Sequence, residues 1–235
     1  MTTASLAAPM SRAATTSLSL LTLSQVVLFL VPLIVLGQAI GWPASLRLPA
    51  AEALPLIARN ALAVQIGYWG YMLTAIAMVP FVIALRRFAR ARGAQGLLVD
   101  TMAALGIAAA VLKTLGIVRW LLAMPTLATL HANSTDPVMR SMIELTYTAT
   151  NAYAGSVGEL LGVQLFSGLW LMLLGLVFAR IGWRLNGLAS LLIGVGFFLN
   201  ALRTIVPELN LLGAVLPPLA LLWLVILAIT FWRRG

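Results

Sequence analysis

The chain of 235 residues contains no cysteine and a single histidine. The absence of cysteine excludes disulfides, iron–sulfur clusters, thiolate zinc sites and cysteine nucleophiles. The one histidine, His131, cannot form a bis-histidine haem or metal site within one chain, and it begins a polar run, HANSTDP, that is typical of an exposed loop. We therefore expect an ordinary loop histidine, no metal site and no cofactor.

Charged residues are also scarce, because they make up 9% of the chain against roughly 25% in ordinary soluble domains. Hydrophobic residues make up 62%, and the mean hydropathy is +1.03, which is more apolar surface than a soluble core can bury. The net charge of +9 would indicate nucleic acid as the partner of a soluble protein. Here no basic stripe is interleaved with aromatic residues, so we expect no nucleic-acid partner and attribute the charge to membrane orientation and anionic lipid head groups.

Six apolar stretches are each long enough to form a transmembrane helix. About 20 mostly apolar residues cross a hydrocarbon core roughly 30 Å thick. The stretches that qualify are 18–40, 61–85, 101–122, 155–179, 185–205 and 209–232. The sequence therefore predicts an all-α protein, a polytopic transmembrane bundle with six spans in a domain at 18–235. Residues 1–17, which are rich in Ser, Thr and Ala, are expected to form a flexible tail.

The basic residues favour one orientation of this bundle. Nine lie beside the spans on one face, namely Arg12, Arg86, Arg87, Arg90, Arg92, Arg180, Arg184, Arg233 and Arg234, against Arg47, Arg59 and Arg140 in the opposite loops. By the positive-inside rule, both termini are cytoplasmic. Outer loops are then expected at 41–60 and 131–150. In the second, Asp136 followed by Pro137 predicts a helix start, so the fourth span either extends outward as an amphipathic helix or is preceded by one.

Four charged residues lie in or against the predicted spans. A charged side chain costs at least about 2.5 to 3.5 kcal/mol in hydrocarbon, so such groups normally face a protein interior or a wet cavity. The predicted topology places all four in the outer half of the membrane, in a layer that can also receive polar side chains from neighbouring spans. The candidate binding residues of this layer are Lys113, Arg119, Glu159, Arg203, Gln65 and Asn200.

This charged layer allows several interpretations. Lys113 and Glu159 are the favoured ion pair, because a lone buried charge would carry the full desolvation cost. Arg119 and Arg203 then leave a surplus of positive charge that suits an anionic head group or a small anion. In a purely structural alternative, both arginines reach the outer interface while the ion pair fixes the helix register. A third interpretation is proton or ion coupling.

Small residues mark one face of the fourth predicted span. Gly158 and Gly162 form a G-x-x-x-G pair, a pattern that lets helix backbones approach closely. We expect this face to pack within the chain rather than to form a dimer.

Two stretches of the chain resemble a known family. They are LKTLGIVRWLLAMPTLA, which begins at Leu112, and GELLGVQLFSGLWLMLLGLVFAR, which begins at Gly158. Through them the chain is similar to a family of uncharacterised bacterial integral membrane proteins, classed as a domain of unknown function. The resemblance covers most of the chain apart from the tail, and it implies a six-helix fold and a location in the bacterial inner membrane. It supplies no activity and no catalytic residues.

The function expected from these observations is binding without catalysis. In the first hypothesis, the outer-leaflet site of a multi-pass inner-membrane protein binds a lipid, a small amphiphile or a partner protein. A small transporter or ion-coupled carrier is the alternative. A membrane-embedded enzyme ranks third, because group transfer or hydrolysis normally requires paired carboxylates, histidines or a metal, and the spans hold only Glu159.

Overall fold

The structure of the chain is a computed structural model that describes residues 12–234. It confirms the all-α prediction, because this part of the chain forms helices and no strand. Six segments are long and apolar enough to cross a membrane, as predicted: Arg12–Ile40, Ala61–Ala91, Leu97–Asn133, Pro137–Arg180, Arg184–Thr204 and Pro207–Arg233. The chain is therefore a multi-pass membrane protein. Most of the predicted tail lies outside the described residues, and from residue 12 onward it belongs to the first helix.

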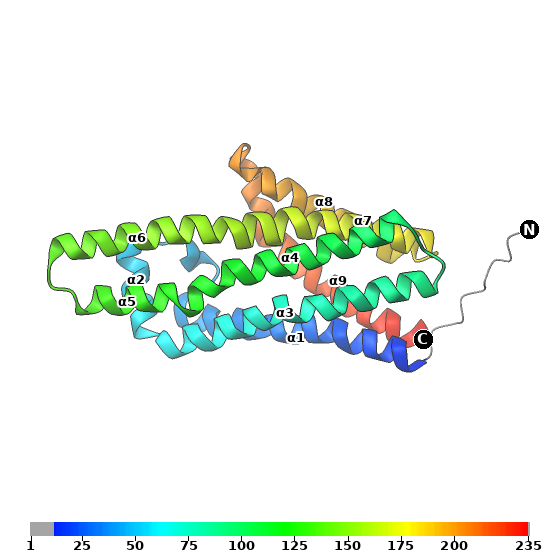
Figure 1. Cartoon of the computed structure of the whole chain (residues 1–235), viewed down its shortest axis with the longest axis horizontal. Helices are drawn as coiled ribbons and strands as arrows, with labels where there is room; N and C mark the ends of the chain where they lie inside the picture. Colours follow the sequence, from blue (N-terminus) through cyan, green and yellow to red (C-terminus); the bar gives the residue numbers. More distant parts are fainter. Residues whose placement is uncertain (1–11, 235) are drawn as a thin grey trace, which may run out of the picture. The chain divides into compact units, whose positions relative to one another are not determined.

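Figure 1 labels the α-helices along the chain. Their bounds are α1 (Arg12–Ile40), α2 (Ala50–Arg59), α3 (Ala61–Ala91), α4 (Leu97–Leu121), α5 (Ala123–Asn133), α6 (Pro137–Gly155), α7 (Ser167–Arg180), α8 (Arg184–Ala201) and α9 (Leu212–Arg234). A π-helical stretch, η2 (Ser156–Phe166), joins α6 to α7. Short 3-10 helices form η1 (Ala44–Arg47), η3 (Leu202–Thr204) and η4 (Pro207–Leu211).

Two of the six segments are much longer than predicted. The third continues past residue 122 as α5, and the fourth begins at Pro137, so at 1.5 Å per residue they measure about 55 and 66 Å. Each is longer than one crossing of a hydrocarbon core about 30 Å thick requires. The start of α6 confirms the predicted cap, because the Asp136 carboxylate accepts a hydrogen bond of 2.9 Å from the Val138 N–H. Of the two predicted alternatives, the fourth span thus extends as one continuous helix from Pro137 rather than being preceded by a separate helix.

The prediction of a loop at 41–60 was wrong, because α2 occupies its second half. This helix buries Ala50, Ala53, Leu54 and Ile57, a spacing that places all four on one face. The buried face packs against α5 and α6. Pro49, which indicated a loop, stands immediately before the first turn, where its missing N–H removes no intrahelical hydrogen bond.

The chain folds into two compact units. Unit 1 comprises residues 1–26, 77–110 and 163–235, and unit 2 comprises residues 27–76 and 111–162. Within unit 1, the antiparallel helices α7 and α8 pack through glycines. A Cβ added to Gly175 would lie 2.7 Å from the carbonyl oxygen of Gly187, so only glycine fits this approach of the two backbones.

Unit 2 has its own apolar core, which lies among α2, α5, α6 and parts of the longer helices. Large buried members of this core are Tyr68, Trp120, Met124 and Tyr147. Figure 1 shows the α5–α6 hairpin in green, with α2 in cyan beside it. This core positions the polar side chains of the candidate site.

Candidate functional site

A close contact between α4 and the π-helical stretch η2 organises the site in unit 2. A Cβ added to Gly116 would overlap the Cα of Gly158, and a Cβ added to Gly162 would lie 2.8 Å from the backbone nitrogen of Lys113. Because no side chain fits at these points, the two backbones meet directly. The G-x-x-x-G face is therefore used in packing within the chain, and it brings the charged residues of α4 close to the segment that carries Glu159.

Arg119 is the centre of this site. Its side chain is only 6% exposed, although it carries a guanidinium. The Nε atom donates to the Asn151 side-chain oxygen at 3.2 Å, and Nη1 donates to the Gly116 carbonyl at 2.5 Å. Nη2 lies 3.9 Å from Oε1 of Glu159, whose side chain is 40% exposed. At 3.9 Å this is an ion pair longer than a direct hydrogen bond.

Gly155 makes room for the guanidinium of Arg119. A Cβ at this position would lie 3.2 Å from Nη2 of Arg119. The small residues of the fourth span thus serve two purposes: they admit the backbone of α4, and they leave space beside η2 for a buried cation.

Two tyrosines near Arg119 have buried hydroxyl groups. Tyr68 stacks on Trp120, with ring centroids 4.6 Å apart and planes at 5°. Tyr68 and Tyr147 are 1% and 2% exposed, and both lie within electrostatic range of the Arg119 guanidinium. Among residues 12–234, neither hydroxyl has a hydrogen-bond partner. A buried hydroxyl without a partner is destabilising by roughly 1 to 3 kcal/mol, so both groups are candidates to bind a ligand or water.

Gln65, the fifth predicted residue of the site, also belongs to unit 2. Its Nε2 donates a hydrogen bond of 3.0 Å to the carbonyl oxygen of Leu121. Leu121 is the last residue of α4. Non-helical backbone angles at Leu122 separate α4 from α5. Carbonyls in the last turn of a helix lack intrahelical partners. Gln65 therefore stabilises the junction of α4 and α5.

Lys113 and Glu159 are both half-buried in unit 2. Glu159 forms an ion pair with Arg119. Direct pairing of Lys113 with Glu159 remains a prediction.

The other two candidate residues belong to unit 1. Asn200, at the end of α8, is 2% exposed, and its side-chain oxygen has no hydrogen-bond partner within the described chain. Its amide nitrogen lies close to α9, where a Cβ added to Gly213 would be 3.4 Å from Nδ2. Arg203 follows in η3 and is half-buried. The six predicted residues are thus divided, with Gln65, Lys113, Arg119 and Glu159 in unit 2.

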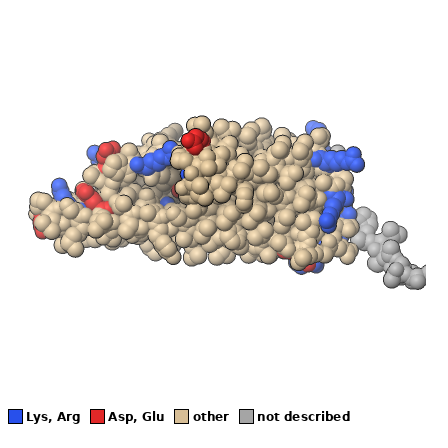
Figure 2. All heavy atoms as spheres, turned by 90° about the horizontal axis from the view of Figure 1, so that it is seen from above, with Lys and Arg blue, Asp and Glu red and all other residues tan. Residues whose placement is uncertain are grey.

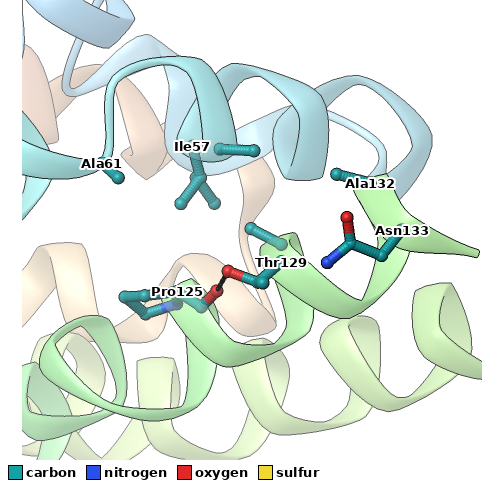
Figure 3. Close-up of a pocket in the computed structure, with 8 residues that line it drawn as sticks. Ile57, Ala61, Pro125, Thr129, Ala132 and Asn133 are labelled. Carbon is teal, nitrogen blue, oxygen red and sulfur yellow. Dashed lines mark hydrogen bonds between the residues drawn. The ribbon is translucent and has the colours of Figure 1, made fainter.

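A cavity of about 250 Å³ opens between α2 and α5 of unit 2. Figure 3 shows Ile57 and Ala61 on one side, facing Pro125, Thr129, Ala132 and Asn133 on the other. Ala58 and Ala128 complete the lining. The Thr129 hydroxyl donates to the Pro125 carbonyl at 3.0 Å, which satisfies it within α5. The cavity is therefore largely apolar, with the Asn133 amide as a polar group in its wall.

Ile57 also lines a second, smaller cavity. It measures about 10 Å³, room for about one water-sized group, and its lining is Ile40, Ser45, Ala53, Leu56, Ile57, Trp120 and Tyr147. Within the described residues, the hydroxyls of Ser45 and Tyr147 both lack a hydrogen-bond partner. Ile57 therefore lines both the apolar cavity and the small cavity to which Ser45 and Tyr147 contribute.

The prediction of an ordinary loop histidine was wrong. His131 lies in the last turn of α5 and is 8% exposed, and its Nε2 is 3.0 Å from Oε1 of Glu144 on α6. This contact joins the two helices of the α5–α6 hairpin. Across residues 12–234, no three His, Asp or Glu side chains gather as a metal site.

Sequence reasoning missed Ser45 and gave Tyr147 no role in the site. Tyr147 had a usable signal, because Ile143, Tyr147 and Asn151 are spaced by four residues and so share one face of α6. Ile143 and Tyr147 are buried, and Asn151 binds Arg119. Ser45 had no such signal, because its burial depends on the path of the chain around η1.

The comparison with family models identifies the chain. Residues 16–232 match the model described as Domain of unknown function (DUF4386), so the chain belongs to that family. The resemblance to a domain of unknown function is thereby confirmed over most of the chain. No curated protein and no solved structure matches it.

Proposed function

We propose that this member of the DUF4386 family is a non-enzymatic binding protein that takes a small amphiphile into unit 2. The apolar part of the ligand occupies the cavity between α2 and α5. Its polar group passes Ile57 and lies near Tyr147 and Arg119. This proposal specifies one of the three ligand classes expected from the sequence, which were a lipid, a small amphiphile and a partner protein.

The observation that carries this proposal is the shared wall of the two cavities. Ile57 lines both, and the smaller cavity is lined in part by Ser45 and Tyr147, whose hydroxyls lack partners within the described residues. A ligand oxygen placed there would accept hydrogen bonds from both hydroxyls and remove the free-energy cost of leaving them unpaired. The apolar cavity alone would select only for hydrophobicity, whereas these two hydroxyls add polarity at one end.

Charge supports an anionic polar group. Tyr147 precedes Asn151 by one helical turn, and Asn151 orients the Arg119 guanidinium. Glu159 approaches Arg119 only to 3.9 Å and is 40% exposed, so it neutralises this buried cation weakly. A guanidinium is well suited to bind a carboxylate or phosphate with two parallel hydrogen bonds. The ligand that we propose is therefore a carboxylate or phosphate with a short apolar tail, of which a single oxygen occupies the smaller cavity.

The size of the cavity limits the apolar part of the ligand. A dry cavity of about 150 Å³ holds benzene, and drug-sized ligands occupy about 300 to 1,000 Å³. The α2–α5 cavity, at about 250 Å³, lies between these limits. It suits a short alkyl chain or a single ring rather than both acyl chains of a phospholipid.

The expected location of this site is the outer leaflet of a bacterial inner membrane. The excess of arginines at the ends of α3, α8 and α9 supports cytoplasmic termini, which would place the α5–α6 hairpin on the opposite side. Because the chain lacks cysteine, a Ser134→Cys variant in the loop between α5 and α6 would carry a single thiol. A membrane-impermeant maleimide should label this thiol in intact cells or spheroplasts. Labelling only after lysis would show that the protein has the opposite orientation in the membrane.

Photolabelling can test the proposed ligand directly. Full-length protein in nanodiscs of neutral phospholipid would be irradiated with a ten-carbon carboxylic acid that bears a diazirine, and with the matching alcohol. We expect adducts of the acid on α2 and α5. Arg119→Gln should lower labelling by the acid about tenfold, because it removes a charged hydrogen-bond donor, and should change labelling by the alcohol much less. Arg140→Gln, which alters an exposed arginine of α6, is the matched control.

A second pair of variants tests the cavity itself. Ala132→Leu places a larger side chain in the wall of the cavity, whereas Thr126→Leu adds a similar group to α5 outside its lining. The first should block labelling by both probes, and the second should not. Adducts scattered over lipid-facing helices, unchanged by Arg119→Gln and Ala132→Leu, would refute the proposal.

One observation supports the alternative of an ion-coupled carrier. Glu159 lies in the π-helical stretch η2, and π-helical turns within helices are frequent at functional sites. A carrier reconstituted in liposomes should dissipate a pH or ion gradient, and Glu159→Gln should abolish the flux. A leak equal to that of empty liposomes would exclude this function.

A further inference from the structure

An aromatic cluster joins the ends of four helices in unit 1. The rings of Phe88 on α3, Trp183 before α8 and Phe231 on α9 lie pairwise with centroids 5.0 to 5.3 Å apart. Phe178 on α7 stacks on Trp183 at 5.7 Å. All four rings are buried. Because these rings touch, residues that lie one or two positions from them in the sequence also gather at this end of unit 1.

Several of those neighbouring positions are arginines. Arg87 precedes Phe88, Arg184 follows Trp183, and Arg180 and Arg233 each lie two residues after a ring of the cluster. Arg92 contacts the cluster directly, because its guanidinium carbon lies 5.2 Å from the Phe88 ring centroid and 5.9 Å from that of Trp183. Cation–π contact of this kind holds a guanidinium in place on a buried aromatic surface.

One carboxylate orders two further arginines of this region. Oδ1 of Asp100, in the first turn of α4, lies 2.7 Å from Nη2 of both Arg86 and Arg90. The other acidic residue of unit 1, Glu208, lies in η4. Asp100 therefore offsets one positive charge and fixes two side chains. We name the whole set the arginine surface: Arg86, Arg87, Arg90, Arg92, Arg180, Arg184 and Arg233.

Exposed apolar side chains accompany the arginine surface. Leu97 at the start of α4 is 83% exposed, Leu185 beside Arg184 is 85% exposed, and Trp232 beside Arg233 is 60% exposed. Figure 2 shows blue side chains at the right end of the view, the end at which α3 is followed by α4 in Figure 1. Arginine, leucine and tryptophan side by side are typical of the interface between lipid head groups and acyl chains.

We propose that the arginine surface binds the phosphate groups of anionic phospholipids in the adjoining leaflet. Guanidinium groups bind phosphate oxygens with paired hydrogen bonds, and here their positions are set by a carboxylate and by aromatic rings rather than left mobile. The exposed leucines and tryptophan would enter the same leaflet beside the bound head groups. This inference concerns unit 1 and does not depend on the amphiphile site of unit 2.

The test uses full-length protein in nanodiscs of mixed phosphatidylcholine and phosphatidylglycerol. Native mass spectrometry after partial delipidation measures how many molecules of each lipid stay bound. We expect phosphatidylglycerol to be retained preferentially, and the double variant Arg92→Gln with Arg184→Gln to lose most of this preference. Basic residues near an anionic membrane contribute about fivefold each to binding, so two substitutions should reduce the preference by more than tenfold. Arg59→Gln with Arg140→Gln, a pair of equal charge change in unit 2, is the matched control and should retain it.

Further measurements distinguish specific binding of lipid phosphate from attraction by net charge and from binding of soluble phosphate. Equal loss of preference in both double variants would mean that net charge alone attracts the lipid, and this would overturn the proposal. Competition by millimolar inorganic phosphate would indicate a soluble phosphate ligand rather than a lipid head group. Arg92→Lys with Arg184→Lys, which keeps the charge, should lose part of the preference, and its melting temperature shows whether unit 1 remains folded. Unchanged preference in the Gln double variant would also refute the proposal.

Discussion

Unit 1 contains ten of the fifteen basic residues and two of the six acidic ones, whereas unit 2 contains five basic and four acidic residues. The excess charge of unit 1 is mostly found at helix ends around an aromatic cluster. In unit 2 the signs are nearly balanced, opposite charges meet in the pair of Arg119 with Glu159, and the carboxylate of Glu144 lies 3.0 Å from the His131 ring nitrogen. The difference shows that net charge does not indicate whether a unit exposes its cations or buries them. The strongly basic unit presents a surface, and the nearly neutral unit buries a cation.

The aromatic cluster should be the feature on which unit 1 depends most strongly. Trp183 is 5% exposed and contacts three other rings, so Trp183→Ala should lower the free energy of unfolding by about 3 to 5 kcal/mol. Trp232→Ala removes an exposed tryptophan from the same unit. This variant should change the free energy of unfolding by no more than about 0.5 kcal/mol in detergent. Thermal and denaturant unfolding in mild detergent would measure both. Equal losses would mean that the cluster does not organise unit 1.

The corresponding feature of unit 2 is the contact between α4 and η2. A Cβ at Gly116 overlaps the backbone of Gly158, so Gly116→Ala should destabilise the protein by about 2 to 3 kcal/mol. Gly37→Ala adds the same methyl group to α1, where the nearest atom is the Trp42 carbonyl oxygen at 3.8 Å. This control should be neutral or should stabilise the helix by up to about 1 kcal/mol. If the free energy of unfolding of Gly116→Ala equals that of the Gly37→Ala control, the backbones of α4 and η2 are not in direct contact.

The buried hydroxyl of Tyr147 distinguishes a binding residue from a structural one. Tyr147→Phe removes a hydroxyl that has no partner within residues 12–234, so stability should stay constant or rise by about 1 kcal/mol. Labelling of α2 and α5 by the diazirine acid should nevertheless fall, because the acid loses a hydrogen-bond donor. Tyr153→Phe alters an exposed hydroxyl of α6 and is the control for both measurements. Lower stability with unchanged labelling would show that Tyr147 binds another group of the protein.

Much of the fold could be predicted because long apolar runs specify membrane spans almost regardless of context. The six spans and the helix cap at Asp136 were recognised from composition and from a local Asp-Pro pair. By contrast, α2 has only ten residues, carries prolines and is helical because its apolar face packs on α5 and α6. Its helical form depends on contacts distant in the sequence.

The candidate site was predicted in part for the same reason. A charge within an apolar run is visible in the sequence, so Arg119 and Glu159 were found. Their mutual approach depends on the glycine contact between α4 and η2. The π-helical form of η2 and the burial of Ser45 follow from packing that no local pattern reveals. His131 was assigned to a loop because it begins a polar run. The helix α5 continues into this run and ends only at Asn133.

The smallest change in stability is expected for Asp100→Asn, and it tests whether charge in unit 1 serves the surface or the fold. Asp100, Arg86 and Arg90 are all about 40% exposed, and ion pairs of this kind contribute little to stability. The melting temperature should therefore shift by no more than about 2 °C. Removal of the negative charge leaves the arginine surface more positive, so retention of phosphatidylglycerol in the nanodisc assay should stay constant or increase. A loss of retention without unfolding would mean that the geometry imposed by Asp100 matters more than the charge it offsets. In that case the two arginines that it holds, rather than Arg92 and Arg184, would form the centre of the lipid site.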